Sequence, residues 1–118
     1  MSIDISIERR QARFLMCIGE PTRLQIIKLL SQGEKCVGDI CQEIGKDQPL
    51  ISHHLRALRE CGIVSARHET QKHYCRLADP ILAELVMLSE KIITELELCQ
   101  SESACCKAIE VSDTKAPG

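Results

Sequence analysis

Residues 47–64 read DQPLISHHLRALRECGIV and contain signals for the start, the end and the buried side of a helix. Aspartate is a favoured helix N-cap, proline is tolerated in a first helical turn, and glycine commonly follows a helix end. The stretch therefore predicts a helix that begins after Asp47 and ends at Cys61-Gly62. At about 100° per residue, its apolar side chains fall on one stripe that faces a core. They are Ile51, Leu55 and Leu58.

A second short helix and a hairpin flank this stretch. Residues 37–44 predict the short helix, which Gly45 closes. Two β-like runs follow at 63–67 and 73–77, and the polar residues 68–72 join them as a hairpin. Two short helices joined by a tight turn and followed by a hairpin form a winged helix-turn-helix. In such motifs the second helix of the pair enters the major groove of DNA.

Apolar helices are predicted on both sides of this unit. A first helix extends to about Gly19, a second begins at Pro21, and a long helix begins at about Pro80. The long helix presents more apolar surface than a small monomer should expose, so we expect a partner helix. The expected fold is mainly α with a small β-hairpin. Residues 1–98 would form the DNA-binding and dimerisation domain, and 99–118 a partly flexible cysteine-containing segment.

The charge is unevenly distributed along the chain. The formal net charge is −2, but residues 53–76 hold five Lys and Arg, two acidic residues and all four histidines. This window therefore carries +3, and the rest of the chain carries −5. A basic middle on an acidic chain indicates a localised surface that binds phosphates.

Six side chains are candidates for contact with double-stranded DNA. Those on the polar side of the helix can read base edges or backbone, and those of the hairpin can lie along the adjacent backbone. They are Gln48, Ser52, His53 and Arg56 on the helix and Arg67 and Lys72 on the hairpin. His54 lies nearer the apolar stripe, so we expect it to pack.

Several functional classes are disfavoured. No local motif combines a nucleophile, a base and an orienting group as a catalytic site would require. The sequence therefore predicts a DNA-binding protein and not an enzyme. No apolar run approaches the roughly 20 residues of a membrane span, and no signal peptide is evident. We therefore expect a cytoplasmic protein. In a reducing cytosol, its eight cysteines indicate metal binding or redox chemistry.

Three stretches carry a family resemblance. They are EPTRLQIIKLL at 20–30, CVGDI at 36–40 and QPLISHHLRALRECGIV at 48–64. Over roughly residues 10–98, the chain resembles the ArsR/SmtB family of metal-sensing repressors. The resemblance implies a homodimer held by the first and last helices, and repression by the ligand-free form. It also implies an ion sensor, whose place differs among members of the family.

The zinc site of the family's last helix is absent. The two acidic positions of that site match Asp79 and Glu95, but the two histidine positions fall on Ile81 and Ile92. A second location, at the start of the short helix, reads Cys-Val-Cys-Asp-Leu-Cys in arsenic sensors. Here the outer two cysteines are present as Cys36 and Cys41, and the middle one is replaced by glycine. This pair is the secondary candidate.

The favoured sensor is a cluster near the C-terminus. Cys99, Cys105 and Cys106 lie within eight residues, among polar neighbours. Trivalent arsenic takes three thiolates in a pyramid, and soft ions select sulfur. The sequence thus predicts arsenite, or a similar soft ion, as an inducer that releases the protein from DNA, with no permanent cofactor.

Two alternatives stay open. The same cysteines can oxidise, which would make the protein a thiol redox-responsive repressor. Cadmium, lead or mercury can replace arsenite as the sensed ion. In certain cadmium/lead sensors of the family, one ligand occupies the position that matches Cys61, but the companion position is Ala57 here. Cys17 and Cys75 are expected to pack inside the protein.

Overall fold

The computed structural model describes residues 6–100, in which α1 spans Ile7–Ile18 and α2 spans Pro21–Leu30. The Ser6 hydroxyl accepts the Arg9 backbone N–H at the start of α1. The Glu20 carboxylate accepts the Arg23 backbone N–H at the start of α2. These caps satisfy backbone donors that a helix start leaves unpaired. The predicted break before Pro21 is confirmed, since the proline stands in the first turn of α2.

The helix-turn-helix consists of α3, Val37–Ile44, and α4, Gln48–Glu60. Gly45 adopts a left-handed φ of 80° and closes α3 as predicted. The Asp47 carboxylate accepts the Leu50 backbone N–H, which confirms the predicted N-cap of α4. Gly62, also at φ 80°, turns the chain away after α4. Short-range chemistry therefore sets both ends of this helix.

Three strands form the antiparallel sheet in the order β1-β3-β2. They are β1, Lys35–Cys36, β2, Val64–Glu69, and β3, Lys72–Leu77. The prediction of a long polar tip at 68–72 was wrong, because His68 pairs with His73 and Glu69 with Lys72. Only Thr70 and Gln71 remain unpaired, at φ 51° and 67°. Two central residues with positive φ match the twist of paired strands, which allows the hairpin to close so tightly.

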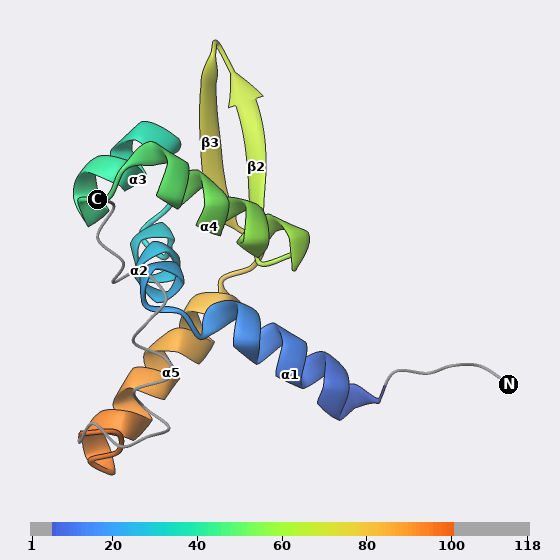
Figure 1. Cartoon of the computed structure of the whole chain (residues 1–118), viewed down its shortest axis with the longest axis vertical. Helices are drawn as coiled ribbons and strands as arrows, with labels where there is room; N and C mark the ends of the chain where they lie inside the picture. Colours follow the sequence, from blue (N-terminus) through green and yellow to red (C-terminus); the bar gives the residue numbers. More distant parts are fainter. Residues whose placement is uncertain (1–5, 101–118) are drawn as a thin grey trace, which may run out of the picture.

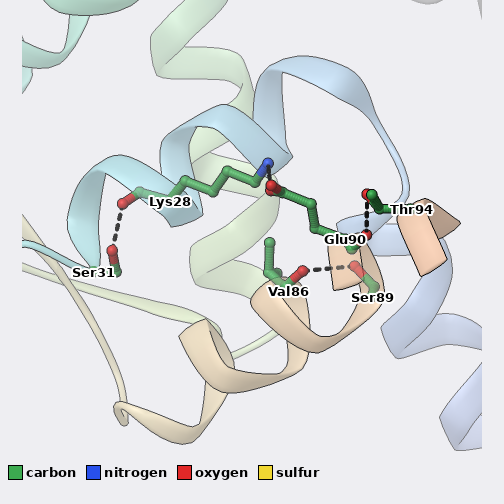
Figure 2. Close-up of polar contacts among 6 residues, drawn as sticks. All are labelled: Lys28, Ser31, Val86, Ser89, Glu90 and Thr94. Atoms are coloured by element: carbon green, nitrogen blue, oxygen red, sulfur yellow. Dashed lines mark hydrogen bonds and ion pairs between the residues drawn. The ribbon is translucent and has the colours of Figure 1, made fainter. Parts of the chain in front are cut away.

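Helix α5, Ile81–Glu95, lies against α2, and Figure 2 shows the attachment. Val86 of α5 is only 2% exposed. The Lys28 ammonium lies 2.5 Å from the Glu90 carboxylate, which links the two helices at the surface. Within α5, the hydroxyls of Ser89 and Thr94 donate to the carbonyls of Val86 and Glu90. Because the ion pair is half exposed, burial of Val86 is the stronger anchor.

Both α5 and α1 carry large apolar side chains that are exposed, among charged neighbours. Figure 1 shows these two helices on the side of the molecule away from the β2–β3 hairpin. Their large exposed apolar residues are Ile7, Leu15 and Met16 on α1 and Ile81, Met87, Leu88, Ile92 and Ile93 on α5. We call these residues the exposed apolar face. The exposed apolar residues that the sequence predicted for the long helix are thus present on α5. No helix within residues 6–100 is both long and apolar enough to cross a membrane.

Candidate nucleic-acid interface

The four DNA-contact candidates on α4 lie together on the exposed side of the helix. They are Gln48, Ser52, His53 and Arg56, and we call them the reading face. On the opposite side, Ile51, Leu55 and Leu58 are at most 2% exposed. The predicted division of α4 into a core side and a polar side is therefore confirmed. The reading face borders a hollow of about 530 Å³ between α4 and the hairpin.

A buried polar network joins the core side of α4 to α2. His54 is 2% exposed, as its predicted packing role requires, and its Nδ1 accepts a hydrogen bond from Arg23 Nε at 3.0 Å. A ring nitrogen that accepts carries no proton, so the His54 proton resides on Nε2. That nitrogen lies 3.8 Å from an oxygen of Glu20, which is itself buried. The network joins the start of α2 to the middle of α4 and fixes how α4 presents the reading face.

Replacing His54 with alanine should lower the free energy of unfolding by about 2–4 kcal/mol, because Glu20 and Arg23 would lose a buried partner. The neighbouring His53 is exposed, so His53→Ala is the matched control and should change stability by less than about 0.5 kcal/mol. Urea denaturation of the two variants measures both values. Equal losses would show that the network does not hold α4.

The two hairpin candidates differ in their surroundings. The Arg67 guanidinium makes two hydrogen bonds to Glu34, at 2.9 and 2.8 Å, and a further one to Glu69. It also lies 4.6 Å from the centre of the Tyr74 ring. Two carboxylates thus neutralise Arg67 within the protein, which reduces its attraction for phosphate. Lys72 is exposed beside the tip of the hairpin, where the predicted backbone contact requires it.

Two residues that sequence reasoning missed line the same hollow. Arg59 follows Arg56 by nearly one turn of α4 and is exposed. His73 reaches the hollow from β3, and its ring stacks on His68 with centroids 4.4 Å apart. The spacing of Arg59 from Arg56 was a usable signal, because residues three apart neighbour each other on a helix. The position of His73 depends on strand register.

The Cys36 and Cys41 candidates lie at the start and in the middle of α3. Cys36 is the N-cap residue of α3, but its side chain makes no capping hydrogen bond. Cys41 packs against the core, and burial raises the pKa of its thiol. A higher thiol pKa leaves less thiolate to bind a soft ion.

The C-terminal cluster is only partly described. Cys99 is exposed and has a positive φ of 58°, four residues beyond the end of α5. Cys105 and Cys106 lie outside the described residues. Within residues 6–100, no three His, Cys, Asp or Glu side chains are grouped to hold a metal ion. As predicted, Cys17 and Cys75 are buried, at 5% and 1% exposure.

Comparisons with known proteins bear on this geometry. Residues 20–66 match the family described as bacterial regulatory protein, arsR family. The arsenical resistance operon repressor of Escherichia coli K12 is 40% identical over 86 residues, which cover 72% of this chain and 70% of that repressor. The probable mercury resistance operon repressor of Streptomyces lividans is 38% identical over 78 residues, covering 66% and 62%.

A solved structure supports the same assignment. The solution structure of a homodimeric winged helix-turn-helix DNA-binding domain from Mycobacterium bovis superposes with a TM-score of 0.70 and 30% identity. The match covers 87% of this chain and all of that domain. The predicted winged helix-turn-helix fold is confirmed. These relatives are DNA-binding regulators, in agreement with the prediction that the chain is not an enzyme.

Proposed function

As the chain belongs to the ArsR family of winged helix-turn-helix DNA-binding regulators, we propose that it is a homodimeric repressor that arsenite releases from its operator. In this proposal, α4 lies in the major groove and Cys99, Cys105 and Cys106 capture the ion. The observation that carries it is the position of Cys99. This exposed thiol lies four residues beyond α5, the helix that bears most of the exposed apolar face.

The chemistry of the cluster supports arsenite over other ligands. Three thiolates meet the pyramidal coordination of trivalent arsenic. Because Cys99 lies beyond the end of α5, it can approach Cys105 and Cys106 without distorting that helix. The E. coli relative is a repressor of arsenical resistance, which agrees with this choice of ion. The Streptomyces relative favours mercuric ion as the second candidate.

A contact path leads from α5 to the reading face. Helix α5 packs on α2 through Val86 and the Lys28–Glu90 ion pair (Figure 2). Helix α2 in turn carries Arg23, which binds His54 of α4. A dimer reads two half-sites whose spacing is fixed by the DNA, so a small rotation of the protomers reduces affinity. Ion capture at the end of α5 is therefore coupled to release.

Arsenite itself tests the proposal. Fluorescence anisotropy of a labelled operator, selected by the protein from random duplexes, should fall as arsenite is added. The fall should persist in excess monothiol reductant, because a three-thiolate complex resists a competing monothiol. Release by peroxide alone, reversed by the same reductant, would support a redox switch instead. Release by mercuric ion but not by arsenite would identify the other ion.

Arg56→Ala should weaken operator binding by about 1–3 kcal/mol and relax sequence preference, because arginine on a groove-facing helix donates two hydrogen bonds to guanine. The side chain of Arg56 is 73% exposed and pairs with Glu60, at 3.8 Å. Competition binding against mutated operators measures the effect. Glu60→Gln serves as a control and should not weaken binding. Unchanged affinity and preference in Arg56→Ala would remove Arg56 from the groove.

A further inference from the structure

Two cysteines outside the proposed arsenite site lie together at the ends of α1 and α4. The Cys17 thiol donates a hydrogen bond to the Ala57 carbonyl, with sulfur and oxygen 3.6 Å apart. The same carbonyl accepts the backbone N–H of Cys61 at 3.1 Å, across the last turn of α4. Both cysteines thus approach one carbonyl group from different helices. The Cys61 thiol is also near enough to raise the pKa of the Cys17 thiol.

The two thiols differ in their access to solvent. Cys17 is buried at 5% exposure, whereas Cys61 is exposed. Burial and the contact with Cys61 raise the pKa of Cys17 to about 11, and the nearby Arg23 guanidinium acts in the opposite direction. Arg23 is held in place by a hydrogen bond to the Cys17 carbonyl at 3.1 Å. An ion that binds here must therefore displace the Cys17 proton, as metal binding to a thiol requires, and the positive charge of Arg23 favours the thiolate that forms. Cys61 supplies the accessible thiol of the pair.

The number of ligands decides which ion fits the pair. Within the described residues 6–100, no third His, Cys, Asp or Glu joins them in a metal-binding group. Arsenite takes three thiolates, and structural zinc takes four ligands. A mercuric ion is satisfied by two thiolates in a linear arrangement. Its complex with two thiolates is neutral, so burying one of the sulfurs leaves no uncompensated charge.

We propose that Cys17 and Cys61 form a dithiolate site for one soft, two-coordinate cation, best matched by mercuric ion. On binding, each thiol releases its proton to solvent and each sulfur forms one bond to the ion, with no change of oxidation state. The ion would join α1, part of the exposed apolar face, to the C-terminal end of α4. This site is separate from Cys99, Cys105 and Cys106 and does not depend on release by arsenite.

The test uses the full chain with Cys36, Cys41, Cys99, Cys105 and Cys106 replaced by serine. Mercuric chloride is added in the presence of excess monothiol, and native mass spectrometry counts the ions retained. We expect one ion per chain and a higher melting temperature, because an ion that binds only the native state stabilises it. Adding Cys61→Ser to this chain should reduce retention at least tenfold. Cys61 is exposed, so this replacement leaves the core intact.

Cys75→Ala in the same chain is the matched control. Cys75 is buried on β3, away from the pair, so this variant should still retain one ion. Retention that survives Cys61→Ser, or that is lost in Cys75→Ala, would overturn the proposed pair. So would the absence of any retained ion before either replacement. One ion per two chains would also overturn it, because the ion would then lie between protomers.

Discussion

Replacing Cys99, Cys105 and Cys106 together with serine should abolish release by arsenite and leave operator affinity unchanged. None of the three belongs to α4 or the hairpin, where the candidate DNA contacts lie. Serine preserves the size of cysteine but removes the soft sulfur that arsenic requires. Anisotropy titrations of the native chain and the triple variant on the same operator make the comparison.

The expected difference is large. If arsenite weakens DNA binding by the native chain a hundredfold, the coupling free energy is about 2.7 kcal/mol, since each tenfold change corresponds to about 1.4 kcal/mol. The triple variant should lose nearly all of this coupling, so that arsenite changes its affinity by less than about twofold.

The pair Cys36→Ser and Cys41→Ser is the matched control, because it removes the other candidate thiols. Cys41 packs against the core and its thiol pKa is raised by burial, so we expect this pair to change release little. The opposite pattern would contradict the proposal. If the triple variant is still released while the Cys36 and Cys41 variant is not, the sensor lies beside the start of α3.

Local sequence chemistry was sufficient to predict the helix-turn-helix. Asp47 as N-cap, Gly45 and Gly62 at left-handed positions, and the spacing of the apolar residues fix α3 and α4. Each of these signals acts within one or two turns of the chain, where propensity and capping are strong. The reading face could be predicted from the rotation of about 100° per residue along a helix, because residues opposite a buried stripe lie on the exposed side.

Contacts between distant segments were not predictable in this way. Strand β1 has only two residues and depends on pairing with β3. Arg67 was predicted to lie along DNA backbone, but its partner Glu34 is 33 positions away in the sequence. The approach of Cys17 to Ala57 spans 40 positions. Such contacts arise only when α1, α4 and the sheet pack, and no local pattern encodes them.

Replacing Leu88 with aspartate should convert the dimer to folded monomers and lower operator affinity at least a hundredfold. Leu88 is 53% exposed in the protomer and lies in the middle of α5, on the exposed apolar face. In a dimer joined through this face, the new carboxylate would be buried without a partner, which costs several kcal/mol. A monomer contacts one half-site only, so it loses the affinity that two linked half-sites provide.

Sedimentation velocity measures the mass of the Leu88→Asp variant, circular dichroism measures its helix content, and anisotropy measures its operator affinity.

Two further variants sharpen the result. Met16 is 76% exposed on α1, so Met16→Asp should also dissociate the dimer if both helices contribute. Lys28→Gln breaks only the exposed pair with Glu90, so it should leave the mass and the affinity of the native protein unchanged. Leu85 is less suited to this test, because it is partly buried against the core of its own protomer and a charge there would also destabilise that protomer. A Leu88→Asp protein that sediments as a stable dimer and binds the operator normally would show that α5 is not the contact between protomers. The proposed coupling between ion capture beyond α5 and the relative setting of the two protomers would then lose its basis.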